Sequence, residues 1–311
     1  MGTHVSQGWA QLDGNGQYWP AQPPGIPQSY YPTPADPLVS PDYEGWWRRG
    51  LRLAGQVWKP ALTLHAIVTV PTLALLIPAN VLLTEENRLL QTAMLDEDTA
   101  MPALSGYLTA TLVFLAATLA VGLISAAAAA VNVRLVVQAA TGQPIRLGTA
   151  TAEGLRRVPA LIGWTLLGNL LAVVAVLMCV LPVFYVGAVL MVLPVLVTLE
   201  RGTGIGRAFT LFHADLGTSV ARVATIAGLT AVTAMALTAV EVGLEVVVGG
   251  TTGTVVGGLW NGVYYLVAGL ALPPLLVTAY ADMRSRLEPF STAYLMPRQP
   301  AQPSAPTPPS V

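Results

Sequence analysis

Residues 160–199 read ALIGWTLLGNLLAVVAVLMCVLPVFYVGAVLMVLPVLVTL and contain no charged side chain. The hydrocarbon core of a bilayer is about 30 Å thick, and a helix needs roughly 20 apolar residues to cross it. The stretch is therefore long enough for two crossings. Leu181 and Pro182 lie at its middle, where a tight turn would divide it into spans at 160–180 and 182–199. These residues predict a membrane hairpin.

Four further apolar runs flank this hairpin. They are too long and continuous for barrel strands, so helices are the structure that satisfies the backbone in lipid. Hydrophobic residues make up 54% of the chain and charged residues 10%, against about 25% charged residues in soluble domains. We therefore expect an all-α membrane protein with six transmembrane helices. The further spans cover 61–83, 104–133, 218–239 with apolar character to 248, and 259–281.

The Lys and Arg residues are segregated between the two sides that these spans define. Fourteen of the fifteen lie on one side, whereas Arg88 lies on the other among acidic residues. Basic residues that flank membrane spans stay in the cytoplasm, so we expect both termini to be cytoplasmic. Abundant Ala, Gly, Val and Pro with a single Lys indicate a bacterial chain, and hence the plasma (inner) membrane. The fourteen are Arg48, Arg49, Arg52, Lys59, Arg134, Arg146, Arg156, Arg157, Arg201, Arg207, Arg222, Arg284, Arg286 and Arg298.

Proline-rich polar sequence lies at both ends of the chain. Residues 1–42 and 291–311 hold too few apolar side chains to form a core, so we predict disordered cytoplasmic tails there. Residues 43–290 form the predicted six-helix transmembrane domain. The sequence has no metal-ligand spacing, nucleotide-binding loop or catalytic motif, so no cofactor is expected and an enzyme is the less favoured class. Dispersed arginines argue against nucleic acid as a partner.

Two segments beside the spans carry an apolar stripe interleaved with arginine. This pattern is typical of an amphipathic helix that lies in the membrane interface with its basic face toward anionic lipid headgroups. We therefore predict cytoplasmic interfacial helices at 44–58 and 205–216. The stripes are Trp47, Leu51, Ala54 and Trp58 in the first segment, and Ile205, Phe209, Phe212 and Leu216 in the second.

Two short motifs carry a family resemblance. They are GRAFTLF at residues 206–212 and YADMRSR at 280–286, the latter preceded by Pro273 and Pro274. Together they resemble bacterial, notably actinobacterial, six-span membrane proteins, whose membrane domain also occurs fused ahead of glycerophosphodiester phosphodiesterase domains. The resemblance covers roughly residues 44–288 and implies a fold and a membrane location, without an assigned activity. The metal-binding carboxylates and histidines of phosphodiesterase chemistry do not occur as a cluster in this sequence. The motif residues are Arg207, Phe209, Tyr280, Asp282, Arg284 and Arg286.

Four polar side chains lie within or at the ends of predicted spans, namely His65, Asn169, Glu241 and Glu245. Carboxylates at membrane depth mark ion or proton paths, so convergence of these residues on one cavity would favour a small transporter or permease. In the alternative, Glu241 and Glu245 lie in the headgroup region at one end of the fifth span. Asn169 and His65 would then hydrogen-bond neighbouring helices.

Asp282 follows the sixth span, in a segment that also contains Arg284 and Arg286. An exposed pair with Arg286 along the helix would contribute only about 0.3–0.5 kcal/mol. A pair with Arg207 or another cytoplasmic residue would instead hold helix ends together, and we favour this structural role. The sequence as a whole predicts a non-enzymatic integral membrane protein that acts through lipid or protein contacts at the inner face. A protein partner and a homo-oligomer both remain open.

Overall fold

The computed structural model describes residues 9–12, 18–20, 31–94, 97–178 and 180–296. A short antiparallel pair, β1 (Trp9–Leu12) and β2 (Tyr18–Pro20), precedes the helices. The remaining elements are helical. They are α1 (Tyr43–Ala93), α2 (Glu97–Ala140), α3 (Leu147–Leu155), α4 (Val158–Met178), α5 (Val180–Leu190), α6 (Leu193–Leu199), α7 (Ile205–Ala214), α8 (Leu216–Val248), α9 (Gly250–Leu287) and the 3-10 helix η2 (Thr292–Leu295).

Six helical segments are long and apolar enough to cross a membrane, so the predicted all-α architecture with six such helices is confirmed. The fourth of them combines α5 and α6, which are separated at Met191 and Val192. Pro194 lies in the first turn of α6, the position at which a helix tolerates a proline best. The prolines inside α1 and α9 interrupt neither helix. The six segments are Tyr43–Ala93, Met101–Ala140, Val158–Met178, Pro182–Leu199, Leu216–Val248 and Gly250–Leu287.

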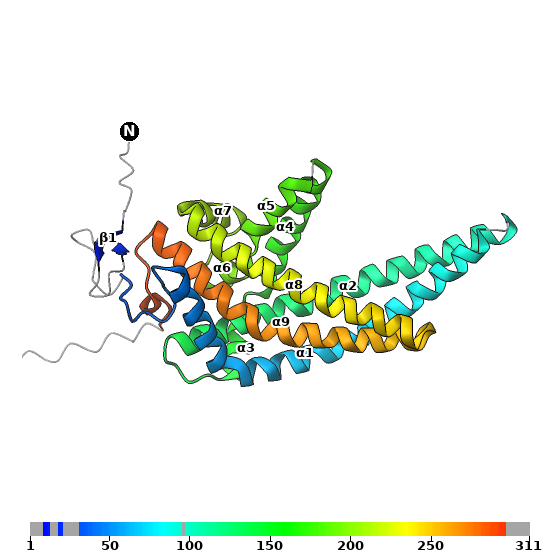
Figure 1. Ribbon diagram of the computed structural model, residues 1–311, viewed down its shortest axis with the longest axis horizontal. Helices are drawn as coiled ribbons and strands as arrows, with labels where there is room; N and C mark the ends of the chain where they lie inside the picture. Colours follow the sequence, from blue (N-terminus) through cyan, green and yellow to red (C-terminus); the bar gives the residue numbers. More distant parts are fainter. Residues whose placement is uncertain (1–8, 13–17, 21–30, 95–96, 179, 297–311) are drawn as a thin grey trace, which may run out of the picture.

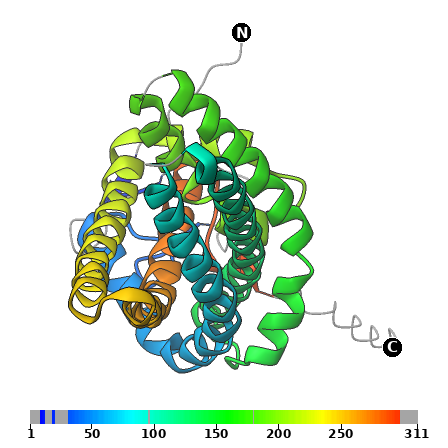
Figure 2. The same ribbon diagram turned by 90° about the vertical axis from the view of Figure 1, so that its right-hand side faces the viewer.

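The long helices form antiparallel hairpins, α1 with α2 and α8 with α9, which lie side by side (Figure 1). Viewed along the bundle, α4 and α5 form a third, shorter hairpin, and α5 contacts α7 and α8 (Figure 2). We call the end where α1 and α8 begin and α9 finishes the basic end. The opposite end, with the α1–α2 and α8–α9 connections, is the hairpin end. The α1–α2 hairpin projects beyond α9 at the hairpin end (Figure 1).

The tightly packed core lies at the basic end. Trp46, Leu196 and Tyr280 are fully buried there. Toward the hairpin end the helices instead expose large apolar side chains, with Leu112 67% and Val247 85% exposed. Apolar surface on this scale is typical of helices that lipid surrounds, because lipid tails cover it as water cannot.

Glycines let α9 approach both of its neighbours closely. A Cβ built on Gly262 would come within 3.0 Å of Leu73 on α1, and one on Gly253 within 2.7 Å of the Glu245 carbonyl oxygen on α8. Small residues allow this contact between backbones in membrane bundles. The glycine spacing in this part of the sequence therefore serves packing within the chain.

The prediction of a disordered N-terminal tail is wrong for residues 31–42, which pack on the basic end. Leu38 and Val39 are fully buried. Asp36 accepts hydrogen bonds from the backbone N–H groups of both residues and from the N–H and hydroxyl of Thr292. Apolar side chains and one carboxylate therefore fix this segment despite its proline content. Among residues 1–30, only the two strands are described, and the remainder lies outside the described residues.

The predicted C-terminal tail is also wrong at its start. Ser291 and Thr292 are buried, and η2 follows directly. Phe290 is fully buried against Tyr280 of α9, with ring centroids 6.2 Å apart. These contacts supply the burial that the composition of the segment does not suggest. Residues 297–311 lie outside the described part of the chain.

Neither segment predicted to be an interfacial helix has the predicted arrangement throughout. Residues 44–58 are the start of α1 rather than a separate helix, and Leu53 and Val57 are buried there. The predicted stripe lies on a different face of α1 from these buried residues, and its members Leu51 and Trp58 are 50% and 48% exposed. In α7, Phe212 is only 3% exposed and contacts protein, so that part of the second stripe does not face lipid.

Candidate functional site

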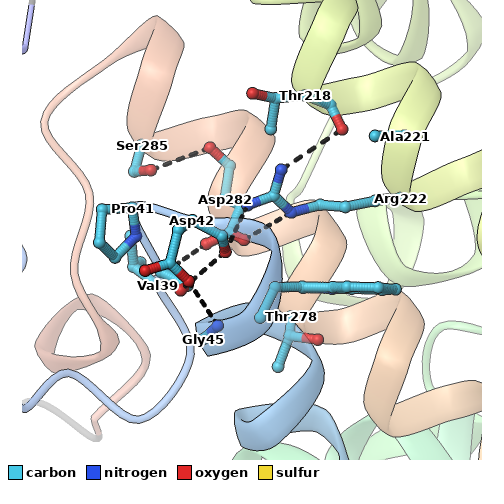
Figure 3. Close-up of polar contacts among 12 residues, drawn as sticks. Val39, Pro41, Asp42, Gly45, Thr218, Ala221, Arg222, Thr278, Asp282 and Ser285 are labelled. Atoms are coloured by element: carbon cyan, nitrogen blue, oxygen red, sulfur yellow. Dashed lines mark hydrogen bonds and ion pairs between the residues drawn. The ribbon is translucent and has the colours of Figure 1, made fainter. Parts of the chain in front are cut away.

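A buried ion pair joins α8 to α9 at the basic end (Figure 3). The Arg222 Nε atom lies 2.8 Å from Asp282 Oδ2, and the two side chains are 3% and 0% exposed. Arg222 also donates to the carbonyl oxygen of Thr218, one turn earlier on its own helix. Asp282 thus has a partner on another helix, as its structural interpretation expects, but the partner is Arg222 rather than Arg207.

The N-terminal segment completes this site. The backbone N–H of Ser40 donates to Asp282, and Arg222 Nη2 donates to the carbonyl oxygen of Asp42 at 3.3 Å. The Asp42 side chain caps α1 by accepting from the Gly45 N–H. Figure 3 shows this segment turning around the Arg222–Asp282 pair. Residues 40–42 therefore close the basic end between α8 and α9.

A second ion pair, between Arg286 and Asp215, lies beside the first. Asp215 is the N-cap of α8 and accepts from both the N–H and the hydroxyl of Thr218. Partial burial would raise the pKa of Asp215, but the Thr218 hydrogen bonds and the Arg286 charge outweigh burial and lower it. Asp215 is therefore an ionised capping group that also holds the end of α9.

A separate cluster around Glu200 connects α6, α7 and α9. Glu200 accepts from the Tyr280 hydroxyl at 2.7 Å and from Arg207 Nε at 3.2 Å. Arg207 Nη2 also lies 2.8 Å from Glu288, and Arg284 contacts both Glu200 and Glu288. Two arginines and two carboxylates thus balance one another. We call these residues, with Tyr280, the Glu200 cluster.

The charges of the Glu200 cluster shift the pKa of its members outside the spans. Burial opposes ionisation of Glu288, but hydrogen bonds from Arg284 and Arg207 outweigh it and lower the pKa of this carboxyl. Burial also acts to lower the pKa of Arg207, whereas its contacts with Glu288 and Glu200 raise it overall. Both groups remain charged near neutral pH, so the cluster acts as a structural clamp between helix ends.

The structure brings together three of the six motif residues that the resemblance singles out, through a partner, Glu200, that sequence reasoning missed. Arg207, Tyr280 and Arg284 meet on Glu200, whereas Phe209 packs against Tyr185 of α5 with ring centroids 5.9 Å apart. Charges at the ends of apolar spans could have identified several of the missed groups. The missed partners are Ser40, Asp42, Glu200, Asp215, Arg222 and Glu288.

Another group of arginines gathers where α3 meets α2. A Cβ on Gly154 would lie 2.8 Å from the backbone nitrogen of Val131, so the end of α3 rests directly on α2. This contact brings Arg157, which follows α3, toward Arg134, one turn beyond Val131. We call Arg134, Arg157 and Arg201 the arginine group.

Within the arginine group, positive charge exceeds negative charge. Arg134 Nη2 donates to the Thr198 carbonyl oxygen at 2.9 Å, just before Arg201, and Nη1 lies 3.7 Å from Glu153. Burial and the neighbouring charge of Arg201 lower the pKa of Arg157. Among the described residues, Glu153 is the only carboxylate that forms an ion pair with a member of the group, and its partner is Arg134. The arrangement suits an anionic ligand group.

Glu241 and Glu245 lie against α9 in the half of the bundle toward the hairpin end. Glu241 lines a cavity of about 320 Å³ and accepts from the Asn261 amide at 3.2 Å. Glu245 lines a different cavity, of about 330 Å³, together with Glu85 and Arg88. The structure therefore places these carboxylates in neighbouring sites rather than in one.

His65 and Asn169 join neither cavity. His65 Nε2 lies 2.7 Å from the Asn132 amide nitrogen, which also donates to the Gly269 carbonyl oxygen at 2.9 Å. These bonds connect α1, α2 and α9, as the structural alternative for His65 expects. Asn169 is exposed on α4. The four polar residues do not converge on one path.

Comparison with protein-family models, curated proteins and solved structures found no match. The family resemblance therefore stays a prediction. Within the described ranges, no group of three His, Cys, Asp or Glu side chains could hold a metal ion. The geometry at the basic end thus supports two chemical roles, structural ion pairing and the binding of anionic groups by the arginine group.

Proposed function

We propose that this chain is a non-enzymatic integral protein of a bacterial plasma membrane, with both termini and the basic end in the cytoplasm. In this proposal it acts through contacts with anionic lipid headgroups at the inner face. The single observation that carries the proposal is the arginine group, in which three arginines gather and, among the described residues, only Arg134 forms an ion pair with a carboxylate, Glu153. Basic groups between helices on the cytoplasmic side are typical binding sites for anionic lipid.

Other arginines at the basic end differ from the arginine group because carboxylates neutralise them. The Glu200 cluster and the pairs made by Arg222 and Arg286 are each matched by carboxylates. Those arginines stabilise the fold and have little capacity left for a ligand. Arg201 is exposed, and Arg157 is partly exposed. The predicted interfacial contacts of Leu51 and Trp58 fit the same orientation.

Competitive association of spin-labelled phosphatidylglycerol and phosphatidylcholine, measured by electron paramagnetic resonance, tests the proposal. The wild-type protein should prefer phosphatidylglycerol, and the double variant Arg157→Gln/Arg201→Gln should lose about tenfold or more of that preference. Each basic side chain near an anionic surface contributes about 1 kcal/mol, and 1.4 kcal/mol is tenfold in affinity.

The double variant Arg48→Gln/Arg88→Gln is the matched control. It removes the same net charge from two exposed side chains that are paired with Glu44 and Glu85. Its lipid preference should stay close to wild type. Equal effects of the two double variants, or no effect of either, would contradict a specific role for the arginine group.

The alternative function, a small transporter, is favoured by one observation, the cavity that Glu241 lines. The separation of Glu241, Glu245, His65 and Asn169 argues against a continuous polar path, so we keep transport as the second candidate. Uptake assays in proteoliposomes distinguish the two functions. Accumulation of a solute that depends on Glu241 would support transport in place of lipid contact alone.

A further inference from the structure

The cavity beside Glu241 lies between the two long hairpins, toward the hairpin end. Helices α1, α2, α8 and α9 all contribute to its wall. Its volume of about 320 Å³ falls within the range of small-molecule pockets. Leu73, Ile77 and Val121 supply apolar surface, whereas Glu241 and Asn261 supply polar groups. A mostly apolar cavity with few polar groups is typical of a site for an organic ligand.

Glu241 has no cationic partner among the described side chains. Its two oxygens share one donor, the Asn261 amide, at 3.2 and 3.4 Å. A carboxylate can accept about four hydrogen bonds, so most of its capacity stays unused. The nearby Arg88 lines the other cavity, where it lies 3.1 Å from Glu85. The Glu241 cavity therefore contains an uncompensated acidic group.

Packing holds this carboxylate in position. A Cβ on Gly257 of α9 would lie 3.1 Å from Glu241 Cγ and 2.9 Å from Glu245 Cγ. Both stems therefore pack against the backbone of the same glycine, which restricts them on that side. A group that is fixed before binding loses less entropy when a ligand arrives.

Aromatic rings complete the chemistry of the cavity. Phe114 on α2 and Tyr265 on α9 line it together with Glu241. Aromatic faces attract cations, and the carboxylate would repel an anion. The apolar lining does not suit a hydrated metal ion, which prefers several oxygen ligands. A neutral apolar ligand would remove water from the carboxylate without replacing its interactions.

We propose that this cavity binds the charged group of an amphiphilic organic cation, with Glu241 as its counter-ion and Phe114 and Tyr265 as aromatic contacts. The site is separate from the arginine group and does not depend on the proposed lipid contact at the basic end. An ammonium group reaches it from one of two sources, a soluble amphiphilic cation or the headgroup of an ethanolamine phospholipid.

Equilibrium dialysis of radiolabelled tetraphenylphosphonium tests the site in protein purified in dodecyl maltoside, a detergent without charge or ammonium. Saturable binding of one cation per chain is expected. Glu241→Gln keeps the shape of the side chain and removes its charge, and it should weaken binding at least tenfold. Glu245→Gln, in the neighbouring cavity, is the matched control and should change binding less than threefold.

Added lipid then separates the two sources. Competition by phosphatidylethanolamine but not by phosphatidylglycerol would assign the site to the lipid headgroup, whereas competition by neither would assign it to a soluble cation. Thermal unfolding of each variant verifies that it is folded. Absence of saturable binding to the wild-type protein, or wild-type affinity in Glu241→Gln, would overturn the proposal. Neither result bears on the lipid preference of the arginine group, so the two proposals fail independently.

Discussion

At the scale of single residues, the basic end depends on charged side chains that are buried away from water. Arg222 and Asp282 are almost completely buried, and the pair joins α8, α9 and the N-terminal segment through Ser40 and Asp42. A buried pair contributes little over an apolar pair of the same shape, but removing one partner leaves an uncompensated charge. Such residues specify how helix ends meet more than they add stability.

Replacement of Arg222 by Met should therefore destabilise the protein by about 3–5 kcal/mol, because Asp282 stays buried without its counter-ion. Unfolding in a mixture of mild detergent and dodecyl sulfate measures this change. The double variant Arg222→Met/Asp282→Leu should recover part of the loss. Arg48→Met, which breaks an exposed pair with Glu44, should cost less than about 1 kcal/mol. An Arg222→Met variant that is as stable as the wild-type protein would show that the pair does not hold the fold.

Two carboxylates outside the spans give the basic end a pH dependence. The pKa of Asp215 and that of Glu288 are both lowered in the folded protein. The stability that they contribute is complete above the ordinary carboxyl pKa of about 4 and declines as the pH falls through the lowered values.

The melting temperature of the wild-type protein should therefore fall more steeply below pH 4 than that of Glu288→Gln. The difference between the two proteins should be greatest near pH 7 and should shrink toward pH 3. If the melting temperatures of the two proteins changed in parallel between pH 7 and pH 3, the assignment of Glu288 as an ionised partner of Arg207 and Arg284 would be contradicted.

At the scale of elements, glycines determine which helices can touch. Helix α3 rests on α2 at Gly154, and α9 rests on α8 at Gly253; in both cases the nearest atoms belong to backbone. A backbone cannot rotate away as a side chain can, so added volume at these positions must separate the helices. The position of the arginine group depends on the first of these contacts.

Gly154→Ala should thus destabilise the protein by about 1–3 kcal/mol, because its new methyl group would overlap the Val131 backbone. It should also weaken the preference for phosphatidylglycerol by displacing Arg157. Gly148→Ala lies on the same helix with open space around it and is the control. This control should be neutral or slightly stabilising, since Ala favours helix more than Gly. Indistinguishable unfolding of the two variants would refute the close contact.

At the scale of the whole molecule, the distribution of packing divides the bundle. The basic end is closed by buried aromatic residues and ion pairs, whereas the hairpin end exposes apolar helices, between which lie the two cavities that Glu241 and Glu245 line. The α1–α2 hairpin projects beyond the start of α9 (Figure 1), and Arg88 lines a cavity with Gly250 and Thr251 near that start. In the proposed topology, the basic end lies in the cytoplasm and the α1–α2 hairpin leaves the bilayer on the other side.

Cysteine labelling tests this orientation in a Cys179→Ser background. A membrane-impermeant maleimide should label Arg88→Cys in intact cells, because this side chain is 73% exposed on the projecting hairpin. Arg156→Cys, exposed near the basic end, should react only after the cells are opened. The opposite pattern would reverse the proposed topology and remove the inner-face assignment of the arginine group.

The sequence alone determined the six apolar helices, because lipid demands long uninterrupted apolar runs and these are visible in one dimension. It also showed that Arg207, Asp282, Arg284 and Arg286 lie next to apolar runs, since charges in such places are conspicuous. Their partners were decided only by the tertiary structure. Glu200 and Tyr280 are 80 residues apart, and Ser40 and Asp282 are 242 apart, so no local pattern connects them.

The ordered terminal segments and the separation of the polar residues also came from tertiary structure. A proline-rich segment such as 31–42 is stable only where a formed bundle buries Leu38 and Val39 and supplies Thr292 as a donor to Asp36. Similarly, the spacing of apolar residues and the composition of a span do not show whether two polar side chains share a cavity. That depends on how the helices are rotated about their axes when they pack. The physical reason is common to both cases. Burial in lipid is a property of a single helix, whereas burial in protein depends on which surfaces meet.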